Sequence, residues 1–159
     1  DHLTAEQLLN YFGVLSGMGG ALIRKRIPEV LSQVSLSDFK KLELKKFSKG
    51  MLQRIGIAQS LLHDPKVLVF DEPMSGLDPI GRKEIRQLMQ SLKAAGKTVF
   101  FSTHIIPDVE EICDQVAVIQ KGVLKVSGPT HQFKTASEIE SFFYEPVAKT
   151  SEEKNTHEK

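Results

Sequence analysis

The sequence predicts an α/β fold with a parallel sheet, preceded by an α-helical part. Two short apolar runs, Val67–Phe70 and Thr98–Phe101, predict strands that are buried on both faces, as in parallel sheets. An amphipathic helical pattern separates the two runs, so we expect one βαβ unit with a right-handed crossover. Before position 48 the apolar residues recur at helical spacing, which predicts the helical part.

The composition is that of a globular protein with one core. Of the 159 residues, 40% are hydrophobic and 26% are charged, which is too apolar for wholesale disorder. The formal net charge of +1 gives no strong field that would attract nucleic acid or an anionic membrane. The single cysteine, Cys113, excludes an internal disulfide and a cluster of thiolate ligands.

The N-terminal segment predicts two helices. Thr4 and Gln7 form a capping box at the start of the first helix, which ends in the glycine-rich stretch 17–20. A Lys-rich stretch, 40–49, follows the second helix, and we interpret it as a solvated surface. The apolar residues of the second helix are Ile23, Ile27, Val30, Leu31 and Val34.

The residues around the two strands predict a further pair of helices. Apolar residues cover most of the segment 51–62, so we expect this helix to be buried on more than one side and to end at Asp64-Pro65. The helix between the strands is expected to have Asp78 as its N-cap and Pro79 at its first position.

The C-terminal part predicts a hairpin and a tail. A strand over 116–119 turns at Lys121-Gly122 into a second strand over 123–126. The polar residues 146–159 predict a disordered tail. The apolar residues of the amphipathic segment between the hairpin and the tail are Ile139, Phe142 and Phe143.

Two acidic residues, Asp71 and Glu72, directly follow the first strand, at the edge of the sheet where α/β domains bind ligands. One carboxylate there can bind Mg²⁺, and a second can deprotonate a water molecule. His104 follows the second strand, and adjacent parallel strands bring it to the same edge. Acids at a strand end are common and a single His there is more often a surface residue, but the combination favours a functional site.

The segment Ser48-Lys49-Gly50 places a hydroxyl group, a cation and free backbone N–H groups at the start of a helix. This arrangement binds anions, because the helix dipole is positive at that end. Ser48 acting only as a helix N-cap explains the same residues. Taken alone, the segment favours this simpler interpretation.

Four motifs in one order resemble the ATP-binding cassette (ABC) ATPase family. Residues 47–51 (FSKGM) match the family's signature motif, and 67–73 (VLVFDEP) match its Walker B motif. Residues 75–78 (SGLD) match its D-loop, and 102–104 (STH) match its switch histidine. The resemblance covers residues 1–130 and is specific, because all four motifs occur at the family's spacing.

This resemblance implies part of a RecA-like P-loop NTPase fold, with ATP and Mg²⁺ as its ligands. Asp71 would bind Mg²⁺ through water, Glu72 would polarise the attacking water, and His104 would contact the γ-phosphate. The implied domains are the remainder of the helical subdomain, part of the ATPase core, a helical extension and a disordered tail. Their ranges are 1–47, 48–128, 129–145 and 146–159.

The other two motifs would act between subunits, because the family works as a head-to-tail dimer. The signature residues would bind ATP held by the second subunit, and they are Ser48, Lys49, Gly50 and Met51. The D-loop residues would cross the dimer interface, and they are Ser75, Gly76, Leu77 and Asp78.

The chain departs from the family pattern in two ways. Lys49 and Met51 replace the usual signature residues, and this form resembles exporters of the ABC-2 type. No phosphate-binding loop (Walker A, Gly-x-x-x-x-Gly-Lys-[Ser/Thr]) precedes Asp71, and Gly96-Lys97-Thr98 enters a strand rather than a helix. The family's base-stacking aromatic residue and its permease-linked Gln are missing too. The chain thus resembles the C-terminal portion of an ABC ATPase, and we expect it to be inactive alone.

The sequence therefore predicts an ATP-hydrolysing subunit of an ABC transporter, an exporter, at the cytoplasmic face of the cell membrane. Its expected partners are a permease on a separate chain and a second ATPase subunit. A soluble ABC ATPase that acts on nucleic acid is a second hypothesis, but the near-neutral charge favours the transporter and no nucleic-acid partner. A truncated remnant or interaction module is a third, supported by the missing phosphate loop.

Overall fold

The computed structural model describes residues 2–133, 138–139 and 141, and it divides into two compact units, Asp1–His104 and Ile105–Lys159. The predicted tail, 146–159, lies outside the described residues, as do Phe142 and Phe143. No helix of the described part is both long and apolar enough to cross a membrane.

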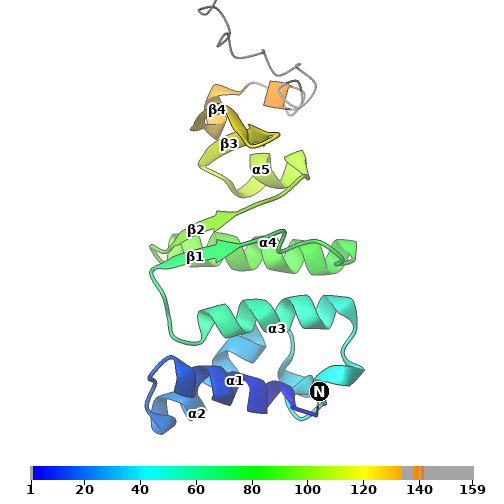
Figure 1. The fold of residues 1–159 in the computed structure, drawn as a ribbon, viewed down its shortest axis with the longest axis vertical. Coiled ribbons are helices and arrows are strands. Elements are labelled where there is room, and N and C mark those ends of the chain that lie inside the picture. Colours follow the sequence, from blue (N-terminus) through cyan, green and yellow to red (C-terminus); the bar gives the residue numbers. More distant parts are fainter. Residues whose placement is uncertain (1, 134–137, 140, 142–159) are drawn as a thin grey trace, which may run out of the picture. The chain divides into compact units, whose positions relative to one another are not determined.

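The first unit begins with three helices that pack on one another: α1 (Ala5–Leu15), α2 (Gly20–Gln33) and α3 (Lys49–Leu61) (Figure 1). The predicted capping box is confirmed, since Thr4 and Gln7 each bond the other's backbone N–H. The buried apolar residues of the three helices include Leu9, Ile23, Ile27, Val30, Leu31, Ile55, Ile57, Ala58 and Leu61. The helical part of the prediction is therefore confirmed.

Helix α3 ends against α2. The Arg26 guanidinium of α2 donates to the Leu61 carbonyl at 2.8 Å and to the Leu62 carbonyl at 3.2 Å. The last carbonyls of a helix have no partner within the helix, so Arg26 satisfies two of them. This contact fixes the C-terminal end of α3 on α2.

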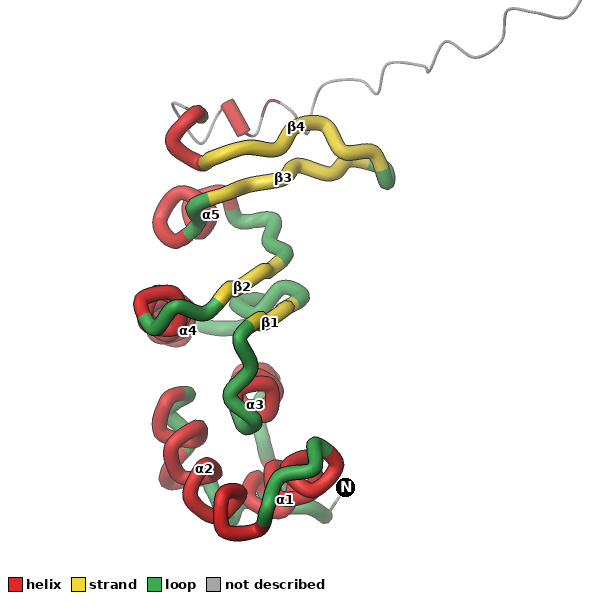
Figure 2. The backbone as a smooth tube through the Cα atoms, turned by 90° about the vertical axis from the view of Figure 1, so that its left-hand side faces the viewer, coloured by secondary structure: helices red, strands yellow, loops and turns green. Residues whose placement is uncertain are grey.

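The βαβ unit consists of β1 (Val67–Phe70), α4 (Pro79–Ala94) and β2 (Thr98–Phe101). The two strands are parallel and lie side by side in Figure 2. Their register pairs Val67 with Thr98 and Phe70 with Phe101. Asp78 is the N-cap of α4, because its carboxylate accepts the Gly81 N–H at 2.7 Å. These elements confirm the predicted strands and the predicted helix between them.

The predicted burial of the strands on both faces is wrong for one face. Leu68 is only 2% exposed, but Val67, Val69 and Phe100 are 60%, 70% and 62% exposed. Alternate residues of a strand point to opposite faces, and α4 packs on β2. The opposite face, with Val67, Val69 and Phe100, is left open in the described part of the first unit.

The second unit contains α5 (Ile106–Ile112) and an antiparallel hairpin of β3 (Gln115–Gln120) and β4 (Val123–Pro129). The hairpin turns at Lys121-Gly122, where φ is +51° and +77°, as a tight type I′ turn requires. The predicted hairpin is therefore confirmed. The buried core of this unit is formed by Ile106, Val109, Val118 and Ile139.

Candidate functional site

The carboxyl ends of β1 and β2 bring the predicted acidic residues next to the residues that follow β2. Because Phe70 pairs with Phe101, the next residues along the two strands are Asp71 and Ser102. The Ser102 hydroxyl donates to Asp71 Oδ1 at 2.5 Å and accepts the Glu72 N–H at 2.9 Å. One hydroxyl group thus contacts both acidic residues.

His104 lies at the same edge and contacts Glu72. The distance from His104 Nδ1 to Glu72 Oε1 is 2.9 Å, and the two side chains are 69% and 45% exposed. At this distance a hydrogen bond joins the His104 ring to the Glu72 carboxyl group. The structure therefore brings Asp71, Glu72 and His104 together at an edge that is open to solvent.

The backbone of Glu72 adopts the left-handed conformation, with φ of +42°. This region is sparsely populated by residues other than glycine and persists where neighbouring contacts determine it. The Glu72 carbonyl accepts hydrogen bonds from Gln53 Nε2 at 3.3 Å and from the Ser75 N–H at 3.0 Å. Both polar groups of this backbone unit are therefore bonded.

Ser48 is the N-cap of α3, because its hydroxyl oxygen accepts the Met51 N–H at 3.2 Å. The N–H groups of the first turn of a helix lack partners within the helix, and the first turn of α3 contains no acidic residue. The simpler prediction, that Ser48 is a cap, is confirmed. An anion at the same helix end stays a prediction.

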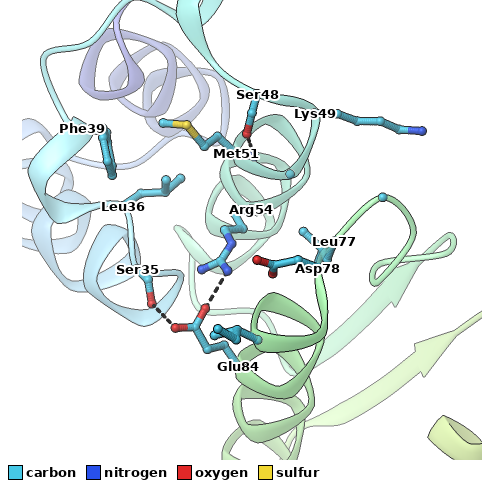
Figure 3. Close-up of a pocket in the computed structure, with 13 residues that line it drawn as sticks. Ser35, Leu36, Phe39, Ser48, Lys49, Met51, Arg54, Leu77, Asp78 and Glu84 are labelled. Carbon is cyan, nitrogen blue, oxygen red and sulfur yellow. Dashed lines mark hydrogen bonds and ion pairs between the residues drawn. The ribbon is translucent and has the colours of Figure 1, made fainter.

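The signature and D-loop residues line one cavity of about 560 Å³ (Figure 3). Ser48, Lys49, Gly50 and Met51 line it from the start of α3, and Gly76, Leu77 and Asp78 line it from the loop before α4. Ser75 is not among the lining residues; its N–H bonds Glu72 instead. The two predicted motifs are therefore neighbours within one chain.

Lys49 and Gly76 approach one another closely at this cavity. Gly76 has φ of +74°, and a Cβ atom there would lie 3.0 Å from Lys49 Cε and 3.1 Å from Lys49 Cδ. The Lys49 side chain extends away from the other labelled residues in Figure 3. The aliphatic part of the Lys49 side chain thus packs on Gly76 of the D-loop. Glycine fits this position because it tolerates a positive φ and because a Cβ atom would crowd Lys49.

Arg54 joins α3 to two other elements beside the cavity. Its guanidinium forms an ion pair of 2.6 Å with Glu84 of α4 and donates to the Val34 carbonyl, after α2, at 3.1 Å. Glu84 also accepts from the Ser35 hydroxyl at 3.5 Å, as the dashed lines of Figure 3 show. These contacts fix the orientation of α3 relative to α4.

Sequence reasoning did not predict that the side chains of Ser102 and Gln53 bond the backbone of Glu72. The parallel register could have identified Ser102, because it places Ser102 opposite Asp71. Gln53 carries no local signal, since 19 positions separate it from Glu72 in the sequence.

Asp71 has the donor chemistry of a magnesium ligand. Its carboxylate is exposed, and one of its oxygens accepts from Ser102. Among the described residues no group of three or more His, Cys, Asp and Glu side chains could enclose a metal ion. Mg²⁺ at phosphate sites commonly uses one or two carboxylates, with water and substrate phosphates completing its shell, so the residues present fit this ion.

The comparison with known proteins identifies related chains. The family model described as "ABC transporter" matches residues 2–75. An uncharacterised ABC transporter ATP-binding protein of Nostoc sp. is 48% identical over 130 residues, which are 80% of this chain and 39% of the relative. The Nod factor export ATP-binding protein I of Ralstonia nicotianae is 39% identical over 132 residues, which are 83% of this chain and 41% of the relative.

The fold matches a solved structure of an ATP-binding subunit of an ABC transporter. The TM-score is 0.79 with 27% identity, and the match covers 90% of this chain and 63% of that one. The matched part of the chain spans 39% and 41% of the two curated relatives named above, which is less than half of their length. The sequence match to these relatives and the shared P-loop NTPase fold show that the chain belongs to the ABC transporter ATP-binding protein family.

Proposed function

We propose that this chain forms part of the ATP-binding and ATP-hydrolysing subunit of an ABC transporter, an exporter. The observation that carries the proposal is the meeting of Asp71, Glu72 and His104 at the carboxyl edge of β1 and β2, with Glu72 and His104 in contact at 2.9 Å. Two acids and a histidine at such an edge suit hydrolysis of a phosphoanhydride such as ATP. A related export protein supports the direction of transport.

The proposed roles at this edge follow from the chemistry of the side chains. Glu72 accepts a proton from the water that attacks the γ-phosphate, while the bond between that phosphate and ADP breaks. His104 donates a hydrogen bond to the γ-phosphate. Asp71 would hold Mg²⁺ through a water molecule, and the bound ion would supply positive charge beside the β- and γ-phosphates.

The residues of the cavity would serve a second subunit. Ser48 and the backbone N–H groups of Lys49 and Gly50 bind the γ-phosphate of ATP held by that subunit, since free N–H groups at a helix start favour anions. Met51 completes this surface. The D-loop residues 75–78 cross the dimer interface, and Asp78 keeps its capping role.

The proposed assembly contains a permease on a separate chain and lies at the cytoplasmic face of the membrane. The ATPase core would comprise residues 48–128, with the remainder of the helical subdomain in 1–47, a helical extension in 129–145 and a tail in 146–159. Because these 159 residues hold no Walker A loop, we propose that they do not hydrolyse ATP by themselves.

The experiment that tests this proposal is Glu72→Gln in the full-length gene product. The amide keeps the shape of the side chain but cannot accept the proton, so ATP hydrolysis should fall roughly 10²–10⁴-fold. ATP binding should persist. Phosphate release and binding of a fluorescent ATP analogue measure the two quantities.

Glu110→Gln is the matched control, because Glu110 is exposed in α5 of the other unit. This variant should hydrolyse ATP at the parent rate, and the 159-residue chain alone should release no phosphate above background. Full activity of Glu72→Gln would contradict the assignment of the base.

A further inference from the structure

Glu72 is held in a strained backbone conformation by contacts from three directions. Its φ of +42° is unfavourable for a residue with a Cβ atom. Its N–H is bonded by Ser102 after β2, and its carbonyl is bonded by the Ser75 N–H and by Gln53. Such a conformation persists only when its surroundings determine it. The direction of the Glu72 carboxylate therefore depends on these neighbours.

Gln53 is the neighbour of Glu72 that lies in a helix, whereas Ser102 follows the adjacent strand β2. Ser75 follows Glu72 in the same loop, whereas Gln53 lies in α3, the helix that begins after Ser48. Its side chain is half-buried, and its Nε2 donates to the Glu72 carbonyl at 3.3 Å. The amide of Gln53 thus joins the helix that carries the signature residues to the backbone of the acidic residue.

Helix α3 transmits displacement along its length. A hydrogen-bonded helix moves nearly as a rigid element, and α3 is attached to α2 and α4 through Arg26 and Arg54. A shift of Ser48 therefore also shifts Gln53. Because Gln53 bonds the Glu72 carbonyl, a displacement of α3 is expected to reach the backbone of Glu72, and with it the contact of its carboxylate with His104.

We propose that Gln53 is a positioning residue that couples the signature end of α3 to the carboxylate of Glu72. The proposal rests on the proposed function, because it assigns Glu72 as the base. In this proposal the hydrogen bond from Gln53 keeps the Glu72 carboxylate directed at the attacking water when the first turn of α3 binds the γ-phosphate of the second subunit. Gln53 itself does not touch ATP.

The test removes the donor and keeps the shape. Gln53→Met in the full-length gene product retains the length of the side chain but has no N–H group. We expect kcat for ATP hydrolysis to fall roughly five- to tenfold, in proportion to one lost hydrogen bond, with KM for ATP unchanged. Gln53→Lys supplies an N–H donor on a side chain that is one bond longer and flexible enough to fold back, and it should restore most of kcat.

A second measurement reads the contact without catalysis. In the 159-residue chain, exchange of the Ser75 amide hydrogen should become roughly fivefold faster in Gln53→Met, because the Glu72 carbonyl that it bonds is less well fixed. The matched control is Gln59→Met on the same helix, since the Gln59 side chain makes no hydrogen bond to any described residue. The control should leave both measurements at the parent value.

The outcomes separate this proposal from the proposed function. If the parent hydrolyses ATP and Gln53→Met matches Gln59→Met in kcat, the coupling is wrong and the proposed function stands. If Gln53→Met raises KM and leaves kcat unchanged, Gln53 acts in binding and the coupling is wrong as well. If the parent hydrolyses no ATP, the proposed function fails together with the catalytic part of this proposal, and amide exchange alone decides whether Gln53 fixes the Glu72 backbone.

Discussion

Ser48 is the residue at which a structural role and a proposed chemical role coincide. Its hydroxyl oxygen caps α3, and it also lines the cavity together with Gly50 and Leu77. A cap needs only an acceptor oxygen, whereas an anion site needs a position without negative charge. The two roles therefore respond differently to a carboxylate at this position.

Ser48→Asp separates the two roles. Asp is as good an N-cap as Ser, so the free energy of unfolding should stay within about 0.5 kcal/mol of the parent value. In the full-length gene product the carboxylate should repel the γ-phosphate of the second subunit, and ATP hydrolysis should be lost with ATP binding retained. Thr4→Asp places a carboxylate at the N-cap of α1 and should leave hydrolysis unchanged. Full activity of Ser48→Asp would reduce Ser48 to a cap.

The loops that precede β1 and β2 are joined by one ion pair. Lys97 Nζ lies 2.7 Å from Asp64 Oδ1 and donates to the Pro65 carbonyl at 2.8 Å. The hydrogen bond from Lys97 lowers the pKa of Asp64, against an opposing effect of desolvation by burial. The pair connects the end of α3 to the end of α4 beside the two strands.

This ion pair predicts a pH dependence of stability. Because the pKa of Asp64 is lower in the folded than in the unfolded chain, its contribution is present above about pH 4 and is lost as the pH falls through the folded value. Asp64→Asn should therefore lower the free energy of unfolding at pH 7 by less than about 1 kcal/mol, since Asp64 is mostly exposed. Asn also tolerates the φ of +55° at this position.

Denaturant unfolding at pH 7 and at low pH measures this difference. Parent and Asp64→Asn should converge at low pH, where both side chains are neutral. Asp38→Asn is the control, because Asp38 is exposed and forms no ion pair with a described residue. A difference that is the same at both pH values would show that Asp64 acts through something other than its charge.

The elements themselves could be predicted from the sequence because their signals are local. Thr4 and Asp78 identify the starts of α1 and α4, and Lys121-Gly122 identifies the hairpin turn. The roles of Gln53 and Ser102 could not be predicted in this way, since their bonds to Glu72 join residues 19 and 30 positions apart. Those bonds depend on how α3 packs and on the register of the strands.

The open face of the β1–β2 pair is a property of the chain as a whole. Val67, Val69 and Phe100 expose more than half of their surface on this face. An apolar run predicts a buried strand, but burial also requires an element that covers each face. Exposed apolar surface of this kind favours association between molecules.

We therefore expect the 159-residue chain to self-associate through this face. Val69→Thr keeps a β-branched side chain but lowers its apolar surface, so the dissociation constant should rise roughly fivefold or more. Sedimentation velocity over a range of concentrations measures it. Val99→Thr makes the same change on a half-buried residue of β2; it should lower the free energy of unfolding and leave self-association unchanged. Equal association of the parent and Val69→Thr would exclude this face as the contact.

The two arginines that attach α3 to its neighbours also affect how the helix can move. Arg26 fixes the carbonyls at one end, and Arg54 joins the middle of the helix to Val34 and Glu84. Because α3 is held at its end and in its middle, a tilt of α2 is expected to move the whole helix as one unit and to carry Ser48 against the D-loop. Loss of either arginine contact is therefore expected to reduce the displacement of Ser48 that accompanies such a tilt.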